Sequence, residues 1–374
     1  MPDPLALDRR GFLRLALGGG VAMPDLAAVR LAGLKPCATS GAAAGTSMFL
    51  AFTSFAVRLE RARDGGGGPP FGGQALLGEC VRFGARGAQV ALSQLPAADR
   101  QALADLRTAY ERRQVEVELS LPASSLDSED AFAHAVEVAA RVGARRARVA
   151  LLSGRRYEDF ASKEEWEAFA AKWRGALLRL RRAFDRHRFP IGIENHKDFL
   201  AADLVSLLRE VDSEYVGACV DFGNNLAMLD DPDETIERLA RYAVTTHVKD
   251  MAVVPTADGF ELSEVPLGRG LLPLDRYVDT IRRVRPSAPF CLEMITRDPL
   301  RVPYKTERYW APFEAEARSA ERIRRFERRV LSRAWNRPLP RISPLTTEAR
   351  LAAEDENVRL SLAYARDALA LAVS

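Results

Sequence analysis

The sequence predicts an α/β fold, a closed (β/α)8 TIM barrel. Short runs of β-branched and other apolar residues alternate along the chain with long amphipathic stretches, the pattern of parallel strands joined by helices. Eight such units fit into about 250 residues, the usual length of a (β/α)8 barrel. An open, doubly wound sheet is the alternative, but no GxGxxG motif follows the first strand to support it.

The expected elements follow one another regularly. Strands are predicted over 48–57, 87–92, 115–121, 146–152, 191–195, 216–222, 244–250 and 289–295. Helices are predicted over 74–83, 97–113, 128–142, 163–186, 201–211, 231–243 and 274–284. Two more helices, 312–334 and 346–372, follow the last strand on either side of "NRPLPRISPL". The chain therefore divides into a leader (1–46), a barrel domain (47–311) and a C-terminal helical extension (312–374), which packs on the barrel or on a partner subunit.

Composition excludes several classes of protein. The 374 residues are 47% hydrophobic and 28% charged, enough to bury a large core. A net charge of +3 gives no reason to expect nucleic-acid binding. The four cysteines form no CxxC pair, and no stretch of 18 apolar residues indicates a membrane span.

The leader carries an arginine pair, Arg9 and Arg10, followed by Phe12, Leu13 and a short Gly-rich apolar run. This pattern resembles a twin-arginine export signal, so we expect export to the periplasm. The alternative is a surface arginine pair at the start of an ordinary helix in a cytoplasmic protein.

Four late strands end in a group that can bind a metal ion: Glu194, Asp221, His247 and Glu293. The carboxyl ends of barrel strands meet at one face, so these side chains are expected to converge. One carboxylate at a strand end is commonplace, but three together repel one another unless a cation lies between them. Carboxylate oxygens with one imidazole suit Mn²⁺ or Mg²⁺, and Co²⁺, Fe²⁺ or Zn²⁺ are alternatives.

Basic residues lie at the ends of the fourth, fifth, seventh and eighth predicted strands and are expected to line the mouth of the barrel. They are Arg155, Arg156, Lys197, Lys249 and Arg297. Arginine suits bidentate recognition of carboxylate or phosphate, which predicts an anionic substrate, a sugar acid or a sugar phosphate. The alternative is that these residues form ordinary ion pairs with nearby acidic residues, namely Glu158, Asp159, Asp250 and Asp298.

The motifs "IENHKDF", "CVDFGNN", "THVKD", "VPLGRG" and "CLEM", in this order, resemble the xylose isomerase-like TIM-barrel superfamily of sugar isomerases and epimerases. The resemblance covers about residues 48–310. It implies a metal held by Glu194, Asp221, His247 and Glu293, with the two glutamates also acting as proton-transfer bases. Many relatives carry a histidine where this chain has Asn224, so the usual epimerase contacts with substrate are in doubt. Asn224 and His196 are still expected to face the substrate.

The leading functional hypothesis is a metal-dependent sugar isomerase or epimerase that works through an enediolate. The alternative is a lyase, a decarboxylase or dehydratase of an oxo sugar acid, on the same site. A DNA-repair endonuclease of this fold needs several histidines on early strands, whereas the chain has four in all and none on the first four strands. A barrel that only binds sugars is the non-enzymatic alternative. The C-terminal helices offer a surface for a homo-oligomer.

Overall fold

The structure, a computed structural model, describes residues 47–63 and 70–373. The predicted twin-arginine leader lies outside these described residues.

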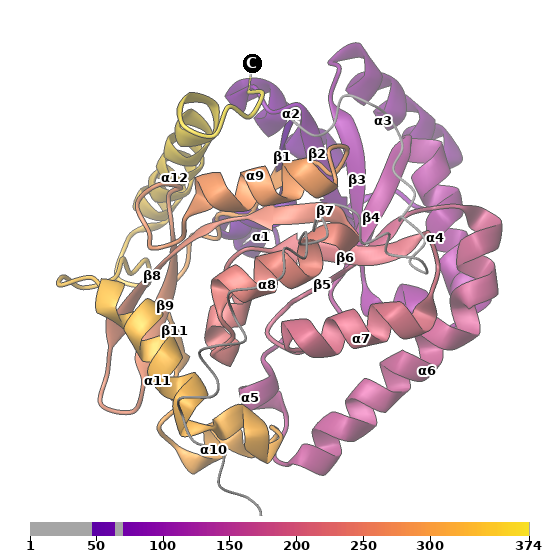
Figure 1. Ribbon diagram of the computed structural model, residues 1–374. Helices are drawn as coiled ribbons and strands as arrows, with labels where there is room; N and C mark the ends of the chain where they lie inside the picture. Colours follow the sequence, from indigo (N-terminus) through magenta and orange to yellow (C-terminus); the bar gives the residue numbers. More distant parts are fainter. Residues whose placement is uncertain (1–46, 64–69, 374) are drawn as a thin grey trace, which may run out of the picture. The chain divides into compact units, whose positions relative to one another are not determined.

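Eight parallel strands close into a barrel, which confirms the predicted fold class (Figure 1). The strands are β1 (Met48–Ala51), β2 (Gly87–Ala91), β3 (Glu116–Leu121), β4 (Ala144–Val149), β5 (Ile191–Glu194), β6 (Val216–Asp221), β7 (Ala243–Val248) and β10 (Phe290–Leu292). Their order around the barrel is β1-β10-β7-β6-β5-β4-β3-β2. This order makes β5, β6, β7 and β10 consecutive neighbours, so their carboxyl ends meet on one side of the mouth.

Helices surround the barrel and bury its outer face. They are α2 (Gly73–Phe83), α3 (Arg100–Arg112), α4 (Glu129–Val142), α6 (Lys163–His187), α7 (Ala201–Val211), α8 (Pro232–Leu239) and α9 (Leu274–Val284). Local chemistry fixes their ends, as α4 shows. The Ser128 hydroxyl accepts a hydrogen bond from the Ala131 amide at its start, and Gly143 ends it at a φ of 77°.

The first strand is shorter than predicted. β1 ends at Ala51, and a 3-10 turn (Phe52–Phe55) leads directly into helix α1 (Ala56–Arg63). Side chains in the turn tie it to the last barrel strand, since Ser54 donates a hydrogen bond to the Leu292 carbonyl. The short, mostly apolar run is compatible with strand or helix, which is why the sequence prediction over 48–57 was wrong beyond Ala51.

A three-stranded antiparallel sheet, absent from the prediction, lies outside the barrel. It consists of β8 (Asp250–Pro255), β9 (Phe260–Val265) and β11 (Leu300–Val302). Figure 1 shows it beside the barrel with α11 (Ala320–Arg329) along it, and Phe326 of α11 stacks on Phe260 of β9. The predicted strand 244–250 therefore covers most of β7 and reaches the first residue of β8.

The loop after β9 is fixed by one buried carboxylate. Asp250 accepts hydrogen bonds from the backbone amides of Gly268, Gly270 and Leu272 at 3.0, 2.8 and 3.1 Å. The "VPLGRG" segment, which begins at the last residue of β9, is thus anchored to the residue that begins β8.

The C-terminal extension packs on the barrel. It follows α10 (Glu307–Trp310) and contains α11 and α12 (Thr347–Asp367). The single helix predicted over 312–334 is broken, because 3-10 turns (Ala315–Arg318 and Leu331–Arg333) lie on either side of α11. Glu354 of α12 accepts a hydrogen bond from the Val57 amide at the start of α1. Two further α12 side chains hold loops at the mouth, because Asn357 donates to Thr296 and Ser361 accepts from the Leu267 amide.

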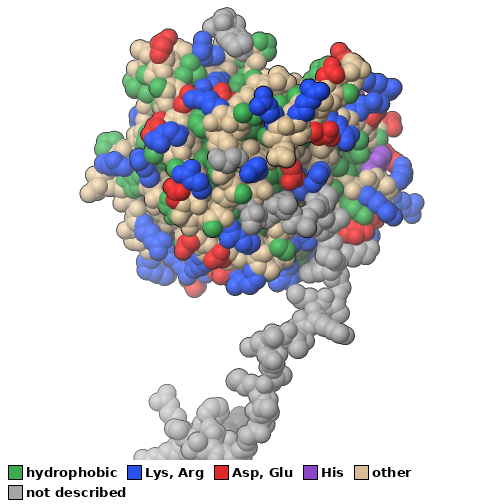
Figure 2. Space-filling view, turned by 90° about the horizontal axis from the view of Figure 1, so that it is seen from above, with side chains coloured by type: hydrophobic (Ala, Val, Ile, Leu, Met, Phe, Trp, Pro, Cys, Tyr) green, Lys and Arg blue, Asp and Glu red, His purple; other side chains and the backbone are tan. Residues whose placement is uncertain are grey.

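The face in Figure 2 shows Lys and Arg side chains interspersed with Asp and Glu. Of the helices that the structure describes, none combines the length and apolar character needed to cross a membrane.

Candidate metal centre and active site

Glu194, Asp221, His247 and Glu293 come together at the carboxyl end of the barrel. Asp221 and His247 are register partners of β6 and β7, and all four side chains are almost completely buried. Nδ1 of His247 lies 3.3 Å from Glu194 Oε1, 3.6 Å from Asp221 Oδ2 and 3.5 Å from Glu293 Oε2. One ligand atom from each residue lies within 4.8 Å of the others.

The electrostatics of this cluster favour a cation. Burial lowers the pKa of His247, but Glu293 and Glu194 outweigh burial and raise this pKa to about 10. Burial raises the pKa of Glu194, yet Arg148 and His247 hold it below its usual range. The cluster therefore holds a proton on the imidazole, and a divalent ion would replace that proton.

Hydrogen bonds aim the carboxylates at the centre. Asp221 Oδ1 accepts from the amides of Gly223 and Asn224 at 2.8 and 2.7 Å, which leaves Oδ2 facing His247. The Asn224 side chain donates to Glu194 Oε1, and the Thr53 hydroxyl donates to Glu293 Oε1, both at 2.9 Å. Asn224 thus lies beside the four residues and its contact with substrate stays a prediction, whereas Thr53 was not foreseen.

The donor set fits a divalent metal ion. Three carboxylates and one imidazole supply hard oxygen ligands and one nitrogen, the set that suits Mg²⁺, Mn²⁺ and related ions. The four ligand atoms lie within 4.8 Å of one another, so these residues could hold one ion together.

Lys249 lies inside this cluster rather than on its rim. Its ammonium group is 2.8 Å from Asp221 Oδ2 and bonds to Glu293, and the side chain is buried. The alternative of an ion pair with Asp250 is wrong, because Asp250 is engaged by backbone amides. Lys249 therefore neutralises part of the charge of the three carboxylates.

Lys197 stands next to the cluster without touching its ligands. Its ammonium group donates to Asn224 Oδ1 at 2.6 Å and lies 3.5 Å from His196 Nε2. Burial, together with Lys249 and Arg297, lowers the pKa of Lys197 to about 8. Nδ1 of His196 is buried and has no hydrogen-bond partner among the described residues. Both side chains are thus available to a bound molecule.

Arg297 and an unpredicted arginine, Arg148, complete the basic groups. Arg297 forms a bidentate ion pair with Glu264 of β9 at 2.5 and 3.2 Å, not with Asp298. Arg148 of β4 lies 3.3 Å from Glu194 Oε2, and its side chain is 11% exposed. Its Nε is buried without a hydrogen-bond partner among the described residues. Arg148 lies within β4 and not after a strand end, so the pattern of strand ends gave no sign of it.

Arg155 and Arg156 are not brought to the cluster. Arg155 pairs with Glu158 at 2.5 Å, as the ion-pair alternative expected. Arg156 donates twice to the Pro312 carbonyl and lies between the rings of Trp166 and Phe313, 4.0 and 4.4 Å from their centroids. The assignment of Arg156 to substrate is therefore corrected, because its guanidinium group joins α5 (Arg156–Asp159), α6 and the C-terminal extension.

Two buried polar residues on early strands were also missed. Gln89 of β2 lies 2.9 Å from His247 Nε2, and its amide donates to Glu118 of β3 at 2.7 Å. Thr245 of β7 donates to the other oxygen of Glu118 at 2.8 Å. The available signal was a polar residue in the middle of an apolar strand, in "GAQVAL" and "VEVELSL".

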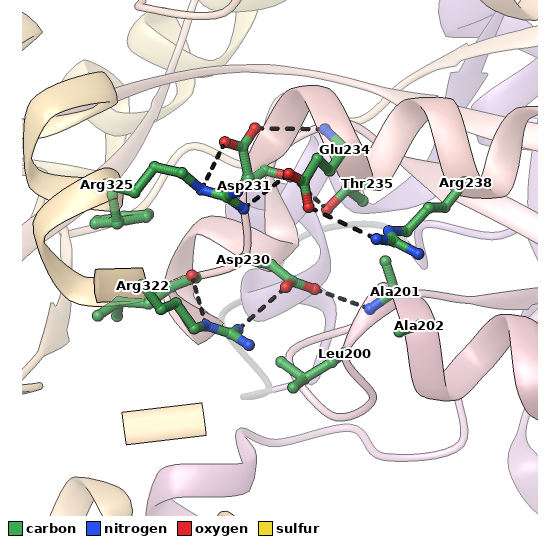
Figure 3. A pocket seen from close by; sticks show the side chains of 12 residues that line it. Leu200, Ala201, Ala202, Asp230, Asp231, Glu234, Thr235, Arg238, Arg322 and Arg325 are labelled. Atoms are coloured by element: carbon green, nitrogen blue, oxygen red, sulfur yellow. Dashed lines mark hydrogen bonds and ion pairs between the residues drawn. The ribbon is translucent and has the colours of Figure 1, made fainter. Parts of the chain in front are cut away.

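A pocket between α7, α8 and α11 lies apart from the cluster (Figure 3). It encloses about 140 Å³, and charged side chains line it. These charges pair with one another, since Arg325 bonds to Glu234 at 2.8 Å and lies 3.6 Å from Asp231. We therefore assign no ligand to this pocket.

Asp230 connects this pocket to the cluster of candidate metal ligands. It accepts hydrogen bonds from Arg322 of α11 at 3.1 Å and from the Asn225 side chain at 2.8 Å (Figure 3 shows the first). Asn225 accepts from Asn195, which in turn bonds to the backbone of Asp221 through both of its side-chain polar atoms. The C-terminal extension thus helps to fix the strand end that carries Asp221.

Comparisons with known proteins agree with this fold. Residues 77–329 match the model of a protein family described as "Xylose isomerase-like TIM barrel". A 101-residue stretch is 35% identical to 3-oxo-isoapionate decarboxylase from Pectobacterium atrosepticum; it covers 26% of this chain and 37% of the relative. The chain therefore spans little more than a third of that relative's length.

Two solved structures show the same fold. One is a xylose isomerase-like TIM barrel protein from Mycobacterium smegmatis in complex with magnesium, at 18% identity and a TM-score of 0.53 over 68% of this chain and 91% of that chain. The other is D-psicose 3-epimerase with D-tagatose from Clostridium cellulolyticum H10, at 13% identity and a TM-score of 0.54 over 86% of this chain and 99% of that chain. The protein belongs to the xylose isomerase-like TIM barrel family.

Proposed function

We propose that the protein is a divalent-metal-dependent lyase that decarboxylates an oxo sugar acid through an enolate. The observation that carries the proposal is Lys197, a buried ammonium group beside the metal cluster whose pKa is lowered to about 8. A donor with such a pKa is well matched to giving a proton to carbon near neutral pH. The local similarity to 3-oxo-isoapionate decarboxylase supports the same class of substrate.

The charges of the site support an anionic substrate. Its acidic and basic groups are equal in number: Glu194, Asp221, Glu264, Glu293, Arg148, Lys197, Lys249 and Arg297. A bound divalent ion would leave two positive charges uncompensated. A substrate carboxylate and the oxyanion formed during the reaction would balance them.

When bound, a divalent ion would polarise the substrate's carbonyl and hydroxyl oxygens and stabilise negative charge on them. Arg148, whose Nε has no hydrogen-bond partner among the described residues, holds the substrate so that its carboxyl group is lost next to the polarised carbonyl. The carbon–carbon bond breaks, carbon dioxide leaves, and the electron pair forms the enolate. Lys197 then donates its proton to the carbon that carried the carboxyl group, and solvent returns a proton to Lys197. Mn²⁺ and Mg²⁺ are the preferred ions, with Co²⁺, Fe²⁺ and Zn²⁺ as alternatives.

The second candidate is a sugar isomerase or epimerase with Glu194 and Glu293 as the proton-transfer groups. The strand order favours it, because β5 and β10 flank β6 and β7 and place the two glutamates on either side of Asp221 and His247. Burial raises the pKa of Glu293, but His247, Lys249 and Arg148 hold it well below its usual range. Glutamates held this strongly in the charged form are weak bases, so we place decarboxylation first.

Isotope labelling separates the two candidates. Mn²⁺-loaded protein is incubated in D₂O with carboxyl-¹³C oxo sugar acids and, separately, with D-psicose, D-fructose and D-tagatose. Release of ¹³CO₂ with one deuterium in the product supports the lyase. Deuterium exchange in a ketose without carbon loss supports the epimerase. Metal-loaded protein that does neither, across both substrate sets, contradicts both.

A further inference from the structure

Three buried side chains form a hydrogen-bond path that crosses the barrel interior from His247 and returns to the strand that carries it. Gln89, Glu118 and Thr245 are fully buried and come from β2, β3 and β7. Gln89 and Glu118 are register partners on adjacent strands. The hydrogen bonds run from His247 Nε2 to Gln89 at 2.9 Å, from Gln89 to Glu118 at 2.7 Å and from Thr245 to Glu118 at 2.8 Å.

The donors and acceptors in this row of hydrogen bonds are arranged in one direction. Each oxygen of Glu118 accepts one hydrogen bond, one from the Gln89 amide and one from the Thr245 hydroxyl. Because both oxygens of Glu118 are acceptors here, the Gln89 amide turns its NH₂ group toward Glu118. Its carbonyl oxygen then faces His247, and it can pair only with a protonated Nε2. An imidazole with its proton on Nε2 offers the lone pair of Nδ1, the atom that faces the three carboxylates.

We propose that Gln89 and Glu118 are positioning residues that keep His247 in the tautomer presenting Nδ1 to the metal ion. This inference rests on the proposed metal-dependent function. Partners that orient a ligand histidine in this way are typically worth about 10- to 100-fold in metal affinity. Neither residue touches the ligand carboxylates in the contacts described above, so both act only through His247.

Paired substitutions test the direction of these hydrogen bonds. Gln89→Met fills the same space but removes the acceptor for His247. Glu118→Gln removes the charge, so the Gln89 amide can turn round and offer its NH₂ group to Nε2. The double variant Gln89→Glu with Glu118→Gln, the exchanged pair, restores the order, because the carboxylate introduced on β2 accepts from Nε2 and from the amide introduced on β3. Thr245→Val is the matched control, since it removes one donor to Glu118 and leaves Gln89 in place.

Two readouts are independent of catalysis. Calorimetric titration of metal-free protein with Mn²⁺ and Zn²⁺ gives the affinity. The ¹⁵N spectrum of Zn²⁺-loaded, ¹⁵N-histidine-labelled protein reports the tautomer, and assignment is simple because the chain has four histidines. We expect the single variants Gln89→Met and Glu118→Gln to bind metal at least about 10-fold more weakly. We expect the exchanged pair to return to within about threefold of wild type, and Thr245→Val to stay within about threefold.

The outcomes separate this inference from the proposed function. If wild-type protein binds no divalent ion, the proposed function fails. If wild type binds metal and the folded single variants bind it equally well, or the exchanged pair is no better than Glu118→Gln, the inference alone is overturned. Thermal unfolding of each metal-free variant shows whether it is folded.

Discussion

The two halves of the barrel contribute to the site in different ways. The late strands β5, β6, β7 and β10 place Glu194, Asp221, His247 and Glu293 at or beside their carboxyl ends. The early half, β1 to β4, contributes groups that act on those four. They are Thr53 after β1, Gln89 on β2, Glu118 on β3 and Arg148 on β4.

This difference separates ligands from their supports. A ligand must project into the mouth, so it lies where a strand gives way to a loop. A supporting group must reach the ligand from behind or from the side, so it can lie within a strand, as Gln89, Glu118 and Arg148 do. We therefore expect large losses of catalytic activity from substitutions beside the late strands. Substitutions in the early half should change KM or metal affinity by smaller amounts.

The largest catalytic effect is expected from Lys197→Met. Removing the proton donor should lower kcat by about 1,000-fold while metal binding persists, because Lys197 contacts none of the metal ligands. In wild type, kcat should fall as the pH rises through about 8, where the Lys197 ammonium loses its proton. Lys172→Met on the exposed side of α6 is the control. A wild-type kcat that stays flat to about pH 9.5, together with an active Lys197→Met variant, would contradict this role.

A smaller effect is expected from Arg148→Gln in the early half. Loss of the guanidinium group should raise KM for an anionic substrate by about 10-fold or more, since charged hydrogen bonds contribute about 1.5–3 kcal/mol. Metal affinity should not weaken, because the change removes a positive charge beside Glu194. Steady-state kinetics and metal titration check both parts. An unchanged KM with weaker metal binding would make Arg148 a structural partner of Glu194 alone.

Thr53→Val should have a milder effect, a loss of metal affinity through Glu293. The variant loses one hydrogen bond to Glu293 Oε1, worth about 1 kcal/mol, so metal affinity should fall about fivefold. Serine is the matched control, since Thr53→Ser keeps the hydroxyl. If valine and serine variants bind metal equally well, the hydroxyl has no part in orienting Glu293.

The smallest effect on activity is expected from Arg156→Lys. Lysine cannot reproduce the paired hydrogen bonds to Pro312 or the contact with two aromatic rings. Stability should fall by about 2 kcal/mol, measured by denaturant unfolding, while kcat and KM stay within about twofold. A raised KM with unchanged stability would contradict this structural role and support the assignment of Arg156 to substrate binding.

The sequence was sufficient for the barrel and for the convergence of Glu194, Asp221, His247 and Glu293, because strand ends in this fold have a known common position. It was not sufficient for groups whose role depends on packing across the interior. Arg156 reads as a cation at a strand end, yet the fold turns it toward Trp166 and Phe313. Gln89 becomes meaningful only once closure of the barrel brings β2 within reach of His247 on β7.

The same limit applies outside the barrel. The sheet of β8, β9 and β11 joins segments that are well separated along the chain, and its short strands carry little signal individually. Glu264 of that sheet reaches Arg297 from outside the predicted strands, so no local pattern could have paired them.

The most direct test of the account is the metal content of wild type and Asp221→Asn, by inductively coupled plasma mass spectrometry after reconstitution and dialysis. Asparagine keeps an acceptor for the amides of Gly223 and Asn224 but replaces the oxygen that faces His247. We predict about one divalent ion per wild-type chain and less than about a tenth of that in the variant. No ion in wild type after exposure to Mn²⁺, Mg²⁺, Co²⁺ and Zn²⁺, or full occupancy in the variant, would contradict the account.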